Sequence, residues 1–186
     1  MRVISGNFKG KKIYEPKDAN TRPLKDLTKE SIFNIINHSN KFKIKIDQAV
    51  VLDLFSGVGS FGIECLSRNA KKVFFVENYN RVLPILKKNL ANLKLIKNFE
   101  IIEKDIYKEK LFENLNIVFD IIFLDPPYKD QNLDKTLIKT KNSRILKKNG
   151  ILILHRHKKE KEIFSTDFKI IEEKKYGISK IIFIAI

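Results

Sequence analysis

The sequence of 186 residues has one cysteine, no apolar run long enough to span a membrane and, apart from its many lysines, no low-complexity tract. A single cysteine, Cys65, excludes an internal disulfide and a cysteine-rich metal site, and its setting in FGIECLSR favours a small core residue on a helix. The first residues, MRVISGNFKG, lack both the apolar core of a signal peptide and the composition of a transit peptide. We therefore expect a cytoplasmic monomer without membrane contact, of a length that suits one domain with a small extension.

The charge balance is strongly positive. Lys and Arg number 37 against 22 Asp and Glu, which gives a net charge of +15 and a pI of about 9.8. A surplus of this kind favours a polyanionic partner, and nucleic acid is the commonest one. The high content of Lys, Ile, Asn and Phe is also typical of an AT-rich genome, so charge alone leaves nucleic-acid binding and codon usage both open.

The amino-terminal part differs in pattern from the rest of the chain. Residues 2–14 alternate apolar and basic side chains around glycines, which predicts a lysine-rich β-hairpin. An approximately helical stripe begins at about Asp26, and KFKIKID then reads as a basic linker or a short strand. We expect residues 1–24 to form a basic β-hairpin extension and residues 25–186 to form the main domain.

From residue 50 onward, strand and helix patterns alternate. The helix after the fourth of these strands is expected to run to Gly150, and two late strands flank Gly177. Alternating βαβ units predict an α/β fold with a mostly parallel, doubly wound sheet. The last two strands predict an antiparallel C-terminal hairpin.

A glycine-rich turn, DLFSGVGSFG, follows the first of these strands and starts at Asp53. Glycines permit a tight turn and let a ligand approach the N–H groups at a helix start. Gly57, Gly59 and Gly62 match the dinucleotide fingerprint G-x-G-x-x-G, with Glu77 ending the next strand. The Asp53 carboxylate, however, would repel a pyrophosphate and suits a cationic amino group. We therefore favour S-adenosylmethionine over a nucleotide or a plain turn.

Two further acidic residues follow expected strands. Glu77 could accept hydrogen bonds from the ribose hydroxyls of either cofactor, and Asp105 lies where an adenine would bind beside the switch point of the sheet. A helix N-terminal acid at Glu77 and a solvated cap at Asp105 are the alternatives.

The stretch FDIIFLDPPYKD joins an apolar strand to Asp125, two prolines and Tyr128. Adjacent prolines end the regular backbone and fix it. An exocyclic amine is a poor nucleophile because its lone pair is delocalised into the ring. The Asp125 carboxylate and the Pro126 carbonyl could accept both N–H bonds, while Tyr128 stacks on the base. Such preorganised acceptors suit methyl transfer to an amine without a metal.

Two histidines, His155 and His157, alternate on a later strand. A zinc site needs further ligands, and no other residues have a suitable spacing. We therefore expect structural or surface histidines and no metal.

Four stretches together, DLFSGVGSFGIECLSR, FLDPPY, MRVISGNFKGKKI and TRPLKDLTKESIFN, resemble the RsmD family. These enzymes are S-adenosylmethionine-dependent methyltransferases that modify a guanine N2 in bacterial 16S rRNA, and the resemblance covers nearly the whole chain. It implies a Rossmann-like class I methyltransferase fold for the main domain. It also implies that the substrate is 16S rRNA in an assembling small ribosomal subunit.

The resemblance also assigns roles to individual positions. Asp53, Gly57 and Gly59 would hold the methionyl part of the cofactor. Glu77 would hold its ribose, and Asp105 with Ile106 would hold its adenine. The guanine amine would bind Asp125 and Pro126 and stack on Tyr128. RNA phosphates would be contacted by Lys9, Lys11, Lys12 and Arg22. Leu27 stands where the family commonly has Arg, which weakens the case for RNA contacts on the helix that begins at about Asp26. Val58 replaces the Ser that the family tends to have in the glycine turn, and the turn tolerates this change because backbone atoms do the binding.

Three other functions stay open at this point. The first is another amino-methyltransferase with the same D-P-P-Y chemistry, acting on a DNA adenine or a protein glutamine amide. The second is a nucleotide-dependent oxidoreductase, suggested by G-x-G-x-x-G. The third is a non-catalytic RNA-binding module.

Overall fold

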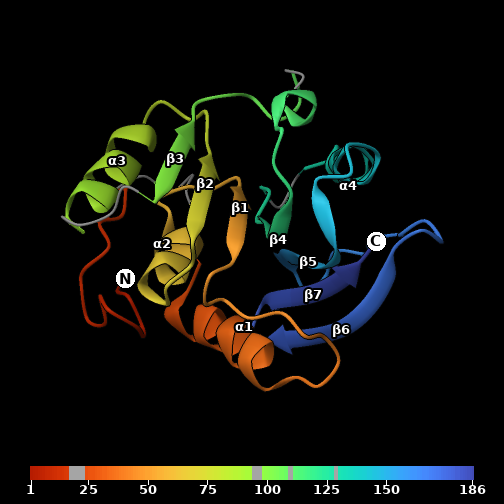
Figure 1. Ribbon diagram of the computed structural model, residues 1–186, viewed down its shortest axis with the longest axis horizontal. Helices are drawn as coiled ribbons and strands as arrows, with labels where there is room; N and C mark the ends of the chain where they lie inside the picture. Colours follow the sequence, from red (N-terminus) through yellow and green to blue (C-terminus); the bar gives the residue numbers. More distant parts are fainter. Residues whose placement is uncertain (17–23, 94–97, 109–110, 128–129) are drawn as a thin grey trace.

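The computed structural model describes residues 1–16, 24–93, 98–108, 111–127 and 130–186. Within these residues, one seven-stranded sheet forms the centre of the molecule (Figure 1). Its strands are β1 (Val50–Leu54), β2 (Lys72–Val76), β3 (Phe99–Ile102), β4 (Phe119–Leu124), β5 (Leu146–His157), β6 (Lys169–Tyr176) and β7 (Ser179–Ala185). Their order is β3-β2-β1-β4-β5-β7-β6. The first five strands pair in parallel, and β7 runs antiparallel to β5 and β6.

The strand order reverses between β1 and β4. The chain moves outward from β1 to β2 and β3, then returns to place β4 on the other side of β1. In open parallel sheets, ligands bind beyond the carboxyl ends of the strands at such a switch point. The glycine turn follows β1 and the two prolines follow β4, so the topology brings both predicted motifs to that position.

Helices cover both faces of the sheet. They are α1 (Asp26–His38), α2 (Ser60–Ser67), α3 (Leu83–Ala91), α4 (Leu133–Asn142) and the 3-10 helix η1 (Phe112–Asn114). Along β1, Val51 packs in a cluster with α1, α2 and α3, whereas Leu52 packs in a second cluster with α4 and η1. This alternation follows from the two-residue period of a strand. The predicted doubly wound α/β fold is confirmed, and Cys65 is a buried core residue on α2 as expected. None of the helices in the described part of the chain is long and apolar enough to cross a membrane.

The amino-terminal segment, residues 1–16, folds back on itself with less regular pairing than a full hairpin. One isolated antiparallel bridge joins Arg2 and Lys12, and turns occupy the residues between them. The N–H groups of Asn7 and Phe8 bond to Ser67 at the end of α2, at 2.7 and 3.0 Å, and not to a partner strand. The proposed boundary after residue 24 stays a prediction.

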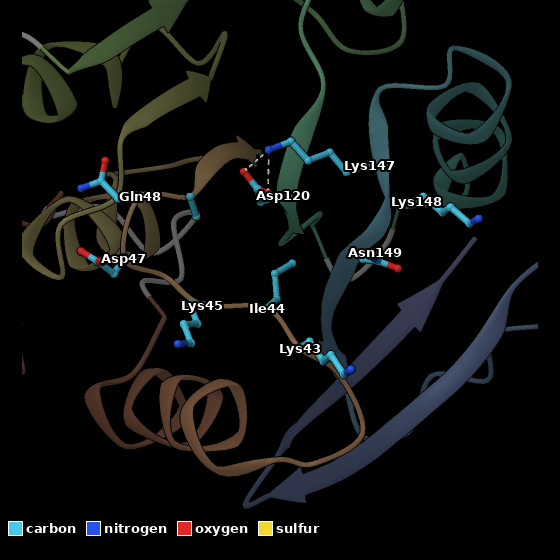
Figure 2. Close-up of a pocket in the computed structure, with 10 residues that line it drawn as sticks. Lys43, Ile44, Lys45, Asp47, Gln48, Asp120, Lys147, Lys148 and Asn149 are labelled. Atoms are coloured by element: carbon cyan, nitrogen blue, oxygen red, sulfur yellow. Dashed lines mark hydrogen bonds and ion pairs between the residues drawn. The ribbon is translucent and has the colours of Figure 1, made fainter.

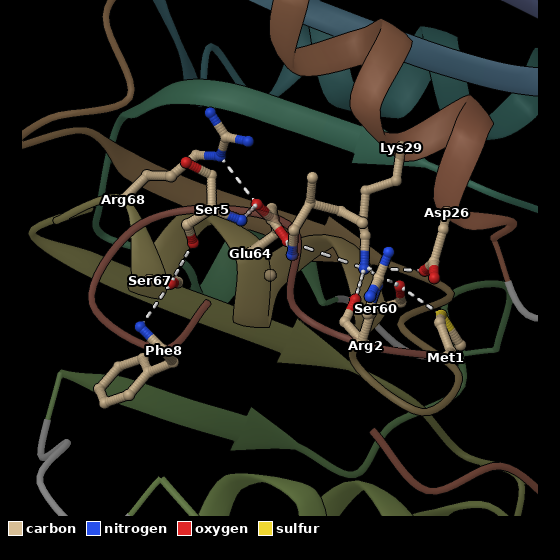
Figure 3. Close-up of polar contacts among 12 residues, drawn as sticks. Met1, Arg2, Ser5, Phe8, Asp26, Lys29, Ser60, Glu64, Ser67 and Arg68 are labelled. Atoms are coloured by element: carbon tan, nitrogen blue, oxygen red, sulfur yellow. Dashed lines mark hydrogen bonds and ion pairs between the residues drawn. The ribbon is translucent and has the colours of Figure 1, made fainter. Parts of the chain in front are cut away.

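A buried ion pair attaches this segment to the helices (Figure 3). The side chains of Lys29 on α1 and Glu64 on α2 are 0% exposed, with Lys29 Nζ 3.7 Å from Glu64 Oε2. Lys29 Nζ also donates to the Arg2 carbonyl at 2.7 Å. The Glu64 carboxylate accepts the N–H groups of Ile4 and Ser5 at 2.8 and 2.9 Å. Burial lowers the pKa of Lys29, and the charge of Glu64 opposes this shift.

The helix after β4 is shorter than the sequence suggests. It ends at Asn142, not at Gly150, and β5 already begins at Leu146. Arg144 has a positive φ of 51°, a conformation that breaks the helix. Lys147 then bonds to Asp120 next to it on β4, at 2.8 Å, which extends the sheet through a lysine-rich stretch.

Candidate active site

The glycine turn carries β1 into α2 through two residues of positive φ. Gly57 has φ of 55° and Gly59 has φ of 84°. A Cβ on Gly57 would meet no atom within 4 Å, whereas one on Gly59 would lie 2.6 Å from Leu86 Cδ1. Gly57 thus borders open space that a ligand could occupy, and Gly59 permits close packing against α3.

Asp53 lies beneath this turn. Asp53 is 1% exposed, and its Oδ2 accepts a hydrogen bond from the Gly62 N–H of α2 at 3.0 Å. Burial raises the pKa of Asp53 well above its usual value, and the nearby carboxylates of Asp125 and Glu77 add to the shift. A cation bound beside Asp53 would stabilise the ionised carboxylate and so lower this pKa. The predicted contact with a cofactor amino group fits this environment and stays a prediction.

Glu77, which follows β2, joins the end of that strand to the glycine turn. Its Oε2 accepts the Gly57 N–H at 2.8 Å, and its Oε1 accepts those of Asn78 and Tyr79 at 2.9 and 2.8 Å. A carboxylate has about four acceptor positions, so about one remains for a ribose hydroxyl. The structure brings Glu77 and Gly57 together as the cofactor hypothesis requires.

Asp105 and Ile106 follow β3, on the same side of the sheet. Asp105 Oδ1 accepts the Tyr107 N–H at 2.8 Å, and its Oδ2 lies 3.8 Å from Lys108 Nζ. Ile106 is buried in the cluster of η1 and α4. The Tyr107 ring packs against Phe55 of the glycine turn, with centroids 5.8 Å apart. These contacts place the β3 loop beside the turn, and the adenine role stays a prediction.

Asp125 directly follows β4, and its carboxylate is held by His155 of the neighbouring strand β5. Its Oδ1 lies 2.8 Å from His155 Nδ1, and His155 Nε2 lies 2.9 Å from Ser179 Oγ. The side chain of Asp125 is 19% exposed, so it remains accessible, while Pro126 is buried. Tyr128, the predicted stacking residue, lies outside the described residues.

The Pro127 carbonyl is fixed from two directions. Arg156 on β5 donates an Nη1 hydrogen bond to it at 3.0 Å, and the Asp130 N–H reaches it at 2.9 Å. Arg156 is held in turn by Glu162, with Nε 3.1 Å from Oε1. Tyr107 donates its hydroxyl to Asp130 Oδ2 at 2.6 Å. Bonds to β5 and to the β3 loop therefore restrict the segment that carries the prolines, in addition to the prolines themselves.

The predicted RNA contacts lie mostly on the amino-terminal segment, where three of the four candidates are exposed: Lys9, Lys11 and Lys12. Two of these lysines stand over aromatic rings, 4.9 Å from the centroid of Phe8 and 5.7 Å from that of Tyr14. Arg22 lies outside the described residues. The phosphate-binding role of all four stays a prediction.

Sequence reasoning missed the residues that hold the Asp125 carboxylate and the segment with the two prolines. The sequence pattern predicts a structural or surface histidine at His155, and it indicates no role for Arg156, Ser179 or Tyr107. Their partners are 23 to 30 positions away in the chain. The one available signal was the position of HRH at the carboxyl end of a parallel strand, on the edge where ligands bind.

A cavity of about 480 Å³ lies away from this site (Figure 2). Lys43, Lys45, Asp120 and Lys147 are among its lining residues, so it borders the amino ends of β4 and β5. Asp125 stands at the opposite end of β4. The chemistry that the motifs predict therefore belongs to the carboxyl edge and not to this cavity.

Comparison with known proteins decides the family. Residues 1–185 match the family model described as Conserved hypothetical protein 95. A Haemophilus influenzae protein named Ribosomal RNA small subunit methyltransferase D is 32% identical over 179 residues, covering 96% of this chain and 90% of that protein. The chain belongs to the RsmD family. A protein of the same name from Buchnera aphidicola is 33% identical over 172 residues, or 92% of this chain and 86% of that protein.

A solved Escherichia coli structure supports the RsmD-family architecture. It is described as a candidate methyltransferase and superposes with a TM-score of 0.83, at 24% identity, over 100% of this chain and 97% of that one. The Rossmann-like methyltransferase fold implied by the resemblance is thereby confirmed. In this RsmD-family chain, the glycine turn and the two prolines occupy neighbouring strand ends at the switch point.

Proposed function

We propose that this chain methylates the exocyclic N2 amine of a guanine in 16S rRNA, within an assembling small ribosomal subunit. Its membership of the RsmD family makes it an S-adenosylmethionine-dependent methyltransferase of ribosomal RNA. The choice of a guanine N2 is the proposal's own step. We also infer that it acts as a monomer in the cytoplasm.

One observation carries the proposal: Asp125 at the switch point is accessible, ionisable and fixed. Its Oδ1 is bonded to His155, and the neighbouring Pro127 carbonyl is bonded to Arg156. A rigid anionic acceptor beside the glycine turn is what methylation of an exocyclic amine requires, because the substrate amine must be turned before it can attack.

The residues around the glycine turn fit the cofactor. Gly57 borders open space, Glu77 retains about one acceptor position, and the buried Asp53 carboxylate would be stabilised by a cationic amino group. When bound, S-adenosylmethionine supplies an electrophilic methyl group on a sulfonium sulfur. Asp53, Gly57 and Gly59 would hold its methionyl part, Glu77 its ribose, and Asp105 with Ile106 its adenine.

The acceptors act on the substrate amine. Asp125 accepts one N–H, and the Pro126 carbonyl accepts the other, which draws the nitrogen lone pair out of conjugation with the base. Positive charge would develop on that nitrogen as it gains the methyl carbon, whose bond to the sulfonium sulfur breaks with its electron pair remaining on the sulfur. The adjacent Asp125 carboxylate stabilises this charge and accepts the proton that the nitrogen then loses.

Methylation of ribosomal particles from a strain lacking this protein tests the proposal. With tritium-labelled S-adenosylmethionine, the wild-type chain should label 16S rRNA. Asp125→Ala should abolish labelling while leaving cofactor binding, measured by calorimetry, nearly unchanged. Asp134→Ala, which alters an exposed carboxylate on α4, is the matched control and should retain full activity. Near-wild-type turnover of Asp125→Ala would show that the acceptor model is wrong.

A further inference from the structure

A chain of polar contacts runs from Asp125 to the far side of β5. His155, on β5, is 6% exposed, and its Nδ1 lies 2.8 Å from Asp125 Oδ1. On the other side of the ring, Nε2 lies 2.9 Å from the hydroxyl of Ser179, the first residue of β7. Three segments distant in the sequence thus meet at one imidazole, directly behind the proposed acceptor.

The bonding partners determine where the ring protons lie. An ionised carboxylate only accepts, so Nδ1 of His155 must carry a hydrogen. When the ring is neutral, Nε2 is an acceptor and the Ser179 hydroxyl donates to it. When the ring is protonated, Nε2 donates and the Ser179 oxygen accepts. The serine therefore holds His155 in the same orientation in both charge states.

We propose that His155, oriented by Ser179, is a positioning residue that fixes the Asp125 carboxylate toward the substrate amine and tunes its acceptor strength through its own protonation. This inference rests on the proposed function. The Oδ1 atom of Asp125 is occupied by His155, whereas Oδ2 has no hydrogen-bond donor among the residues that the structure describes. With Oδ1 held by His155, Oδ2 is the oxygen that we assign to the amine.

The surrounding charges decide how His155 titrates. Burial alone would lower the pKa of His155, but the charge of Asp125 and the hydrogen bond to it outweigh burial and raise it. Arg156 on the same strand acts in the opposite direction. From β7, Lys180 pairs with Glu162, which also pairs with Arg156. Glu160 lies 3.9 Å from Arg156 Nη2, so two carboxylates face these two cations.

A pH dependence of methyl transfer follows. The imidazolium form of His155 partly neutralises Asp125, which then stabilises the positive charge on the substrate nitrogen less well. The kcat should therefore rise with pH as His155 loses its proton, in a step centred above pH 6.5, the usual pKa of histidine.

Substitutions at His155 separate positioning from tuning. His155→Ala should lower kcat about 10- to 100-fold with little change in KM, because a hydrogen bond to a charged group is lost. His155→Asn places an amide nitrogen near the position of Nδ1, so it should restore much of kcat but lose the pH step. Ser179→Ala should weaken the orientation of the ring and give an intermediate kcat. His157→Asn, two residues along the same strand, is the matched control and should keep both kcat and the pH step.

Nuclear magnetic resonance of the His155 ring gives a readout that does not depend on activity. The pKa measured for His155 should fall in Asp125→Asn and remain unchanged in His157→Asn. If wild-type protein methylates rRNA but His155→Ala keeps full kcat, or if His155→Asn keeps the pH step, the inference is overturned and the proposed function stands. If wild-type protein methylates no RNA, the proposed function fails, whatever the His155 pKa.

Discussion

Replacing Glu64 by Gln should reveal how strongly the buried ion pair holds the amino-terminal segment (Figure 3). The amide has the same shape but no charge, so it leaves the Lys29 ammonium, 0% exposed, without its buried counter-charge. Removing one partner of a buried pair costs about 3–5 kcal/mol. Because Asp26 remains 3.7 Å from Lys29, we expect the lower end, a loss of about 3 kcal/mol in the free energy of unfolding.

A double-mutant cycle isolates the cause. Lys29→Met alone should cost only about 1 kcal/mol, because Glu64 keeps the backbone N–H groups of Ile4 and Ser5 and its bond to Arg68. In the Lys29→Met background, Glu64→Gln no longer strands a buried cation. Its cost should therefore drop to about 1 kcal/mol, because the Gln amide nitrogen still faces the N–H group of Ile4 or Ser5, and the coupling should be about 2 kcal/mol.

Urea denaturation of the four proteins measures these values, and its pH dependence gives a second check. Because burial lowers the pKa of Lys29, the unfolded state keeps this proton at pH values where the native state has lost it. The contribution of Lys29 to stability should therefore rise with pH between its lowered pKa and 10.5, the usual value for lysine. Additive single-mutant effects, or a loss below about 1 kcal/mol for Glu64→Gln, would refute the account of a stranded buried charge.

Three further outcomes follow from the site. Gly57→Ala should lower the free energy of unfolding by only about 1 kcal/mol, because alanine is strained at the positive φ of this position. It should nevertheless weaken S-adenosylmethionine binding in calorimetry, because the added methyl group enters the open space that the cofactor would occupy. Tyr107→Phe should lower kcat about tenfold in the labelling assay, since the bond that restrains Asp130 is lost; unchanged kcat would contradict this. Replacing the three lysines of the amino-terminal segment by Ala should make the slope of log K for RNA binding against log salt shallower by roughly 2 units. These lysines are Lys9, Lys11 and Lys12. An unchanged slope would show that they do not contact RNA phosphates and would favour codon usage as the origin of their charge.

The mostly parallel, doubly wound sheet and the edge on which the candidate site lies could be predicted from local patterns. Apolar runs separated by helical stripes indicate βαβ units, and parallel strands all point their carboxyl ends to one edge. The glycine turn and the D-P-P segment each follow such a strand, so their meeting at the switch point required no knowledge of distant contacts. The observed strand order places them beside each other, as expected.

The residues that hold the Asp125 carboxylate and the Pro127 carbonyl could not be found in this way. His155 reaches Asp125 across 30 positions, and Arg156 reaches Pro127 across 29, so each pair forms only after the sheet assembles. Likewise, the local sequence of residues 146–150 predicts the end of a helix, but these residues form the start of β5. There Lys147 pairs with Asp120 on the neighbouring strand β4. Local propensity loses to tertiary contacts at such positions.

Mapping the methylated atom tests the central claim most directly. Small ribosomal subunits from a strain lacking this protein would be incubated with the purified chain and S-adenosylmethionine, and the nucleosides and proteins then analysed by mass spectrometry. We predict one new methyl group, on the N2 of a guanine in 16S rRNA, and none with Asp125→Ala. A methyl group on a DNA adenine, on a protein glutamine amide or on another RNA atom in parallel assays, with 16S rRNA guanine N2 unmodified, would contradict the account.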